Sequence, residues 1–180
     1  MVDERKTREI VKYIALKSVN DPTFGRTKLN KVLFYCDFLA YKFLGSSITG
    51  DTYHKEQFGP VPNSIRRILD EMKRNGEIVE ILNLYGGYEQ YKPAALVPPD
   101  MSVFGPEEVV WVDNVLDQLR KKNATQVSDL SHRFHGWQLA EMNETIPYES
   151  VLFSVQDPTE EEIAYGKSLT EYASECLAGT

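Results

Sequence analysis

Apolar residues recur at helical spacing in four stretches of the chain, and these stretches set most of the expected fold. The spacing predicts helices over residues 3–18, 27–44, 62–75 and 106–123. The second stretch is apolar on nearly every side, which is typical of a helix enclosed by several neighbours. We therefore expect residues 27–44 to form the central helix, with Thr27 as its N-cap and Gly45 as its C-cap.

The remaining stretches predict a small amount of β-structure and further short elements. A β-prone run at 53–58 precedes Gly59-Pro60-Val61-Pro62, which predicts one strand followed by a rigid bend. Residues 78–82 and 88–92 flank Tyr85-Gly86-Gly87 and predict a β-hairpin. The other expectations are an irregular connection at 93–105, a short helix at 125–130 capped by Thr125, a loop at 145–157 and a last helix at 158–178.

These elements together predict an α+β fold that is predominantly α-helical. We expect a compact helical domain with a small central antiparallel β-sheet or hairpin, and we expect residues 1–180 to form this single domain. A chain of 180 residues can bury enough surface to be stable without disulfides or a structural metal.

The overall charge excludes a generally basic nucleic-acid binder. The chain has 20 Lys and Arg against 27 Asp and Glu, a formal net charge of −7. Such a protein repels phosphate backbones on average, so nucleic acid is a partner only if a local basic face exists.

Cys36 and Cys176 lie far apart and outside any CxxC pair, which indicates a reducing compartment. The charged N-terminus lacks the features of a signal peptide, and the longest apolar stretch, 32–44, is too short and too charged to span a bilayer. A cytoplasmic location without membrane association is expected.

Familiar catalytic motifs are absent from the sequence. There is no phosphate-binding GxxxxGK[ST] loop, no GxGxxG, no GxSxG and no HExxH. His132 and His135 are spaced to share a helix face, but two histidines without an acidic or cysteine partner do not complete a zinc site. We therefore expect no enzymatic activity, no cofactor and no metal.

Asp37 is the most informative single residue, because it is a carboxylate among apolar neighbours. A buried unpaired charge costs several kcal/mol, so it requires a partner. The candidates are a tyrosine hydroxyl, His132 or a backbone amide within residues 131–137, and a direct binding role remains open. The adjacent Cys36 is expected to be an inert core thiol.

One pattern favours DNA binding as an alternative. A helix with basic residues followed by a hairpin has the order of a winged-helix DNA-binding domain. Acidic residues dilute the basic face of this helix, and the simpler interpretation is a solvated helix beside a hairpin that covers the core. The basic residues concerned are Arg66, Arg67, Lys73 and Arg74.

Three ordered motifs resemble those of a known family. The segment Thr27-Lys28-Leu29-Asn30-Lys31-Val32-Leu33-Phe34-Tyr35-Cys36-Asp37-Phe38-Leu39 is similar to the signature helix of the Panacea domain, the SocA-like antitoxin family. Ser47-Ile48-Thr49-Gly50-Asp51-Thr52-Tyr53, followed by Phe58-Gly59-Pro60-Val61-Pro62, resembles the second motif. Leu130-Ser131-His132 with Trp137 resembles the third, and the likeness covers about residues 7–142. This chain departs from the family pattern at Phe134, where an acidic residue is common, and at Gly136, where Ala or Pro is common.

The resemblance implies an antitoxin of a bacterial or phage toxin–antitoxin system. Its partner would be a cognate toxin protein encoded by the adjacent gene and neutralised by direct contact, with the acidic balance steering the domain toward a basic toxin. The alternatives are a winged-helix-like DNA-binding regulator and an adaptor that delivers a partner to a protease.

Motif residues are the candidates for partner binding. If a contact surface is present, the aromatic and arginine side chains best able to anchor it are Tyr53, Phe58, Arg66 and Trp137. Core packing is the alternative for each, and Phe58 and Trp137 are expected to be buried. Gly59 and Pro60 are expected to shape the bend. The full candidate set is Lys28, Lys31, Asp37, Tyr53, Phe58, Gly59, Pro60, Arg66, His132 and Trp137.

Overall fold

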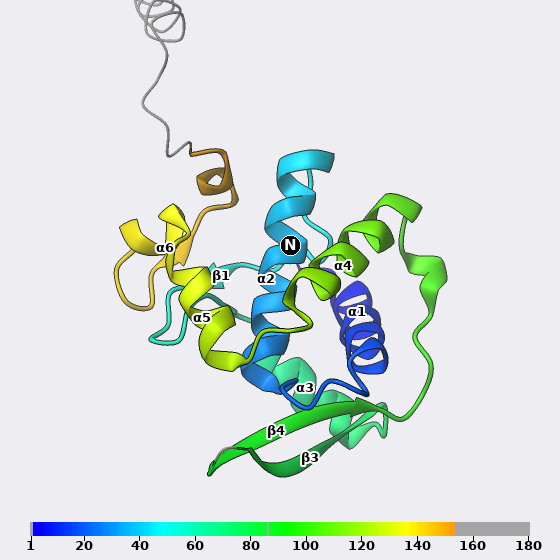
Figure 1. Cartoon of the computed structure of the whole chain (residues 1–180). Helices are drawn as coiled ribbons and strands as arrows, with labels where there is room; N and C mark the ends of the chain where they lie inside the picture. The colour runs from blue at the N-terminus through cyan, green and yellow to red at the C-terminus, as the bar shows by residue number, and fades with distance from the viewer. Residues whose placement is uncertain (1, 86, 154–180) are drawn as a thin grey trace, which may run out of the picture.

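A long central helix surrounded by shorter elements organises the fold (Figure 1). The computed structural model describes residues 2–85 and 87–153, so the helix expected at 158–178 lies outside the described residues. The described helices are α1 (Glu4–Lys17), α2 (Arg26–Leu44), α3 (Ile65–Arg74), α4 (Pro106–Leu119), α5 (Ala124–His132) and α6 (His135–Leu139), with 3-10 turns η1 (Met101–Val103) and η2 (Tyr148–Leu152). The described strands are β1 (Tyr53–His54), β2 (Val61–Pro62), β3 (Ile78–Tyr85), β4 (Tyr88–Ala95) and β5 (Thr145–Ile146).

Helix α2 is the central helix, as its apolar pattern predicts. It contacts α1, α4, α5, η2, β2 and β4, and most of its side chains are buried. Gly45 ends it in the left-handed conformation with φ of 81°, which glycine adopts without steric cost. The expected N-cap was wrong: the helix begins one residue earlier, at Arg26, and Gly25 is its N-cap.

The β-structure forms two separate small sheets. Strand β1 lies between β2 and β5, and both pairings are antiparallel. Strands β3 and β4 form the expected hairpin, in which Ile78 pairs with Ala95 and Tyr85 with Tyr88. The fold class is therefore α+β with helices predominant, as the sequence indicates.

Several expected boundaries differ from the structure. The strand expected at 53–58 is only two residues long, because the chain leaves the sheet at Lys55 and returns as β2. Helix α3 begins only at Ile65, and α4 ends at Leu119 instead of 123. Asn123 caps α5, a role predicted for Thr125. The stretch at 145–157 was expected to be loop-like, but it contains β5 and η2.

Two hydrophobic clusters share α2. The larger one joins α2 to α1, α3 and α4, and it includes the buried Cys36, whose thiol pKa is raised by burial. The smaller one is aromatic and joins α2 to β1, β5 and the segment after α5. Its core is Phe34, Phe38, Tyr53 and Ile146, with Phe134, Trp137 and Tyr148 packed against it. The second cluster holds the elements that carry the three motifs in one place.

Candidate partner-binding site

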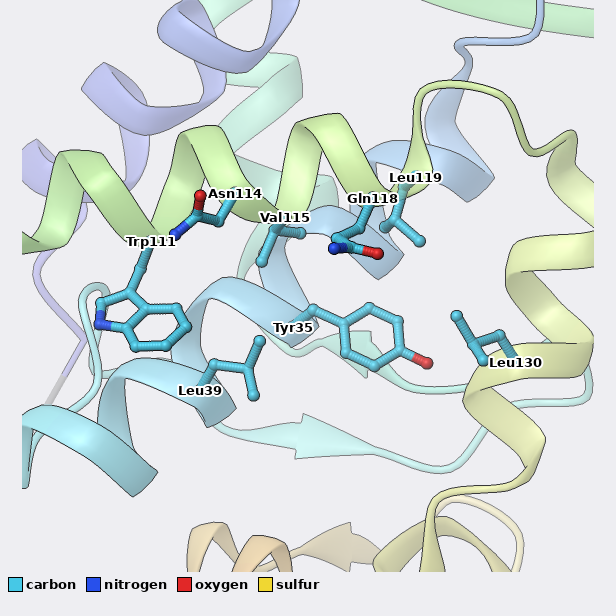
Figure 2. A pocket seen from close by; sticks show the side chains of 8 residues that line it. All are labelled: Tyr35, Leu39, Trp111, Asn114, Val115, Gln118, Leu119 and Leu130. Carbon is cyan, nitrogen blue, oxygen red and sulfur yellow. The ribbon is translucent and has the colours of Figure 1, made fainter.

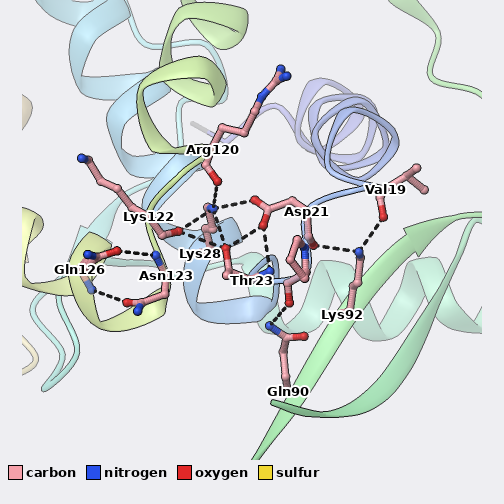
Figure 3. Close-up of polar contacts among 11 residues, drawn as sticks. Val19, Asp21, Thr23, Lys28, Gln90, Lys92, Arg120, Lys122, Asn123 and Gln126 are labelled. Carbon is pink, nitrogen blue, oxygen red and sulfur yellow. Dashed lines mark hydrogen bonds and ion pairs between the residues drawn. The ribbon is translucent and has the colours of Figure 1, made fainter. Parts of the chain in front are cut away.

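Lys28 fastens the start of α2 to the end of α4. Its buried ammonium donates to the Asp21 carboxylate at 2.6 Å, to the Thr23 hydroxyl at 3.0 Å and to the carbonyl oxygens of Arg120 and Lys122 at 3.2 and 2.7 Å (Figure 3). Burial acts to raise the pKa of Asp21, but the hydrogen bonds from Lys28 and Thr23 and the Lys28 charge outweigh it, so the pKa is lowered. All the hydrogens of the Lys28 ammonium have partners within the chain, so this candidate residue has a structural role inside the fold.

Asp37 fastens the middle of α2 to the turn that leads into β1. Its carboxylate accepts from the backbone N–H groups of Ile48 and Thr49 at 2.9 and 2.8 Å, from the Thr49 hydroxyl, and from the Tyr53 hydroxyl at 2.7 Å. Burial raises the pKa of Asp37 to about 6 against the opposing effect of these donors. Of the expected partners, the tyrosine hydroxyl is correct, whereas His132 and the amides of 131–137 are not partners of Asp37.

The loop from Lys55 to Pro60, between β1 and β2, is the point where the three motifs meet. From α2, the buried Lys31 ammonium donates to the Pro60 carbonyl oxygen at 3.0 Å. From α5, Ser131 approaches Gly59 so closely that an added Cβ would lie 2.2 Å from the Ser131 hydroxyl oxygen and 2.6 Å from Cε of Lys31. Gly59 also has a φ of 97°, which other residues adopt only with strain. Glycine is therefore required here both by space and by backbone conformation.

His132 and Trp137 support the same loop from its other side. Their rings stack with centroids 4.1 Å apart, and the Trp137 indole N–H donates to the Glu56 carbonyl at 3.3 Å. The Lys55 ammonium lies 4.3 Å from the Trp137 ring centroid and donates to the Ala140 carbonyl. Burial, together with the nearby Lys31 charge, lowers the pKa of His132. The third motif thus holds the loop in one conformation.

Phe58 projects from this supported loop into solvent. Its side chain is 64% exposed, so the expectation that it is buried was wrong. It lines two neighbouring hollows of about 650 and 700 Å³, which also share Arg26 and Thr27 at the start of α2. The first hollow includes Arg66 of α3, and the second includes Tyr91 of β4. We call Phe58, Arg26, Thr27, Arg66 and Tyr91 the Phe58 surface.

The structure separates the ten candidate residues into two groups. Phe58 and Arg66 are exposed, and within the described residues Arg66 forms no ion pair. Tyr53 was a candidate anchor with core packing as the alternative, and the structure places it in the core: it is 1% exposed and packs in the aromatic cluster. Trp137 is partly buried against the loop. The remaining candidates, which support the surface from inside or beside it, are Lys28, Lys31, Asp37, Gly59, Pro60 and His132.

Two residues of the Phe58 surface escaped the sequence reasoning. Arg26 directly precedes the first motif, forms an ion pair with Glu80 and lies 4.9 Å from the Tyr91 ring centroid. Its position next to the motif was a usable signal. Tyr91 is 33 residues after Phe58, and nothing in its local pattern indicates that the hairpin returns to the start of α2.

The two departures from the family pattern are linked in space. The Phe134 ring packs on Phe34 and Phe38, with centroids 5.2 and 5.3 Å apart. An added Cβ on Gly136 would lie 2.7 Å from that ring and 2.2 Å from the Ser150 hydroxyl oxygen. The small residue at 136 therefore leaves room for the large one at 134.

A third hollow lies apart from the motifs. Tyr35, Leu39, Trp111, Asn114, Val115, Gln118, Leu119 and Leu130 line about 480 Å³ between α2, α4 and α5 (Figure 2). Its lining contains no charged side chain. It shares no residue with the Phe58 surface.

The fold and the motif cluster define a predominantly helical α+β domain, and the comparisons give its family. The chain belongs to the antitoxin SocA-like, Panacea domain family, whose sequence model matches residues 29–138. That match includes the second and third motifs and the first motif from Leu29 onward, and it supports a general antitoxin-type role. No curated protein and no solved structure matches the chain.

Two further features are absent from the described residues. Among these residues no helix is long and apolar enough to cross a membrane. In the same part of the chain no cluster of three or more His, Cys, Asp and Glu side chains could hold a metal ion.

Proposed function

We propose that this protein neutralises a cognate toxin protein by binding it directly through the Phe58 surface. The observation that carries the proposal is the exposure of Phe58 on a loop of the second motif that the first and third motifs support. Aromatic and arginine side chains beside hollows are the commonest anchors of protein interfaces. A loop whose backbone is held by contacts within the chain also loses little entropy on binding.

The proposed mechanism is stoichiometric cover of the toxin rather than chemical modification. The net charge of −7 would favour a basic toxin and would speed the encounter between the two proteins. Such a toxin would be encoded by the adjacent gene, and the complex would form in the cytoplasm.

The test is co-expression in a bacterial host. The product of the adjacent open reading frame is expressed alone and together with this protein, colony survival is counted, and the pair is then copurified. We expect growth arrest by the neighbour, relief by this protein, and a stable complex. Growth arrest that this protein relieves without forming a complex would reject neutralisation by direct binding and favour the protease-adaptor alternative.

The winged-helix alternative keeps only part of its basic face. Arg67 is paired with Glu4 and Glu71, and Lys73 with Asp70 and Glu80, whereas Arg66 and Arg74 form no ion pair within the described residues. Phosphate binding requires cations that are free to exchange their counterions for phosphates. A salt-dependent shift of promoter DNA by the purified protein would nevertheless restore this alternative.

A further inference from the structure

The uncharged hollow between α2, α4 and α5 has two aromatic walls that are held in place from outside it (Figure 2). The Trp111 ring is stacked on the Phe43 ring, with centroids 4.7 Å apart and an angle of 6° between the rings. The Tyr35 ring packs edge-on against Phe34, with centroids 5.1 Å apart. Neither Phe43 nor Phe34 lines the hollow, so an occupant is not needed to fix either wall. Ring faces of this kind favour a planar aromatic occupant.

The lining also carries one hydroxyl and two amides, which have no hydrogen-bond partner in the described part of the chain. These polar groups belong to Tyr35, Asn114 and Gln118. Tyr35 is partly buried, and burial is the only cause that raises the pKa of its hydroxyl. A buried tyrosine hydroxyl usually has a partner. Asn114 and Gln118 are one helical turn apart on α4, so their amides border the hollow from the same helix face.

The hydroxyl and the two amides disfavour a purely apolar occupant. Such an occupant would take these groups out of water without replacing their hydrogen bonds, and that loss costs free energy for each group. Each amide offers both a donor and an acceptor, which is the combination that the edge of a purine base requires. A planar heteroaromatic molecule therefore matches the walls and the polar groups together.

The charges in and around the hollow disfavour a charged occupant. Its lining contains no acidic or basic side chain. The acidic residues beside it on α4 have partners of their own, since Asp113 pairs with Lys17 and Asp117 with Arg120. The net charge of −7 also repels anions. A phosphorylated ligand would thus find no countercharge in this hollow.

We propose that this hollow binds an uncharged purine, as the free base or as a nucleoside. Its volume of about 480 Å³ lies within the range of small-molecule sites. The purine ring would stack on an aromatic wall, and its edge would exchange hydrogen bonds with the amides of Asn114 and Gln118. The hollow shares no residue with the Phe58 surface, so this proposal does not depend on the toxin.

Calorimetric titration of the full chain with adenosine and inosine tests the proposal. AMP is the matched charged probe, because it has the ring and sugar of adenosine with an added phosphate. We expect saturable binding of at least one nucleoside at one site per chain. AMP should bind roughly tenfold more weakly than adenosine, because its phosphate has no cation to pair with.

Two variants place the binding in this hollow. Gln118→Leu and Tyr35→Phe each remove one polar group and nearly preserve the size of the side chain. Each should weaken nucleoside binding roughly tenfold, the effect of losing one net hydrogen bond. Gln138→Leu is the matched control, since Gln138 is an exposed glutamine of α6 outside the hollow, and this variant should bind like the wild type.

Circular dichroism checks that each variant retains its helices. A wild-type protein that binds neither adenosine nor inosine would overturn the proposal. Equal nucleoside affinity in the wild type, Gln118→Leu and Tyr35→Phe would place the binding elsewhere and would also overturn it. Tighter binding of AMP than of adenosine would contradict an uncharged ligand. A wild type without nucleoside binding whose Gln118→Leu variant no longer protects cells from the toxin would assign the hollow to the toxin instead.

Discussion

Gly59 shows how single residues hold the loop that carries Phe58. Its φ of 97° and its closeness to Ser131 and Lys31 leave no place for a side chain. The sequence identified Gly59-Pro60 as a bend, but the partners that close in on it come from α2 and α5. Spacing alone could not reveal those partners, because they are 28 residues before and 72 residues after Gly59.

Gly59→Ala is expected to lower the free energy of unfolding by about 3 kcal/mol, the sum of backbone strain and overpacking. Gly45→Ala is the matched control, because Gly45 has a similar φ of 81° but nothing within 4 Å of its added Cβ. It should cost only about 1 kcal/mol. Urea unfolding of both variants checks this, and equal losses would show that crowding at Gly59 is unimportant.

The lowered pKa of the buried Lys31 ammonium predicts that the stability of the protein depends on pH. Burial lowers the pKa of Lys31 to about 7 in the folded chain, against about 10.4 for an unfolded chain. Between these values the unfolded state binds more protons, so this contribution to stability rises with pH and is lost as pH falls toward 7. The free energy of unfolding should therefore gain about 1 kcal/mol between pH 7 and 8 from this group.

Lys31→Met is expected to remove that gain, whereas the exposed Lys42→Met should retain it. Urea unfolding of the three proteins at the two pH values provides the measurement. The same pH dependence in Lys31→Met as in the wild type would mean that Lys31 is not the titrating group.

At the scale of elements, the helices were predictable and the short strands were not. Helical periodicity is local, so α1, α2 and α3 were located with boundary errors of at most three residues. Strand β1 exists only because β2 and β5 pair with it, and β5 is about 90 residues away in sequence. Such two-residue strands have no periodicity of their own, so a pattern search extends or misses them.

The link between α2 and β1 depends on Asp37, which the sequence did single out. Asp37→Ala would leave the buried N–H groups of Ile48 and Thr49 without an acceptor, so it should cost about 4 kcal/mol of unfolding free energy. Asp70→Ala, which removes an exposed partner of Lys73, should change it by less than about 1 kcal/mol. Urea midpoints of the two variants measure the difference. Similar small effects in both would contradict the role assigned to Asp37.

At the scale of the whole molecule, the fold brings three separated motifs to one loop and exposes one aromatic side chain above them. The family and the importance of the motifs could be read from the sequence, whereas the division into supporting and exposed residues could not. Tyr53 and Phe58 illustrate this difference. Both are aromatic residues of the second motif, but Tyr53 is buried in the core and Phe58 is exposed to solvent. Burial depends on elements distant in sequence, so the residue type and its spacing were insufficient.

The most direct test of the central claim is neutralisation by a Phe58→Ala variant. Leu139→Ala is the control, because Leu139 is 72% exposed and lies outside the Phe58 surface. Affinity for the neighbour-encoded toxin is measured by calorimetry, alongside survival of the co-expressing host. Loss of an interface anchor typically costs about 2 kcal/mol, so Phe58→Ala should bind roughly 30-fold more weakly and protect poorly, while Leu139→Ala matches the wild type. A Phe58→Ala variant with wild-type affinity and protection would contradict the assignment of this surface to the toxin.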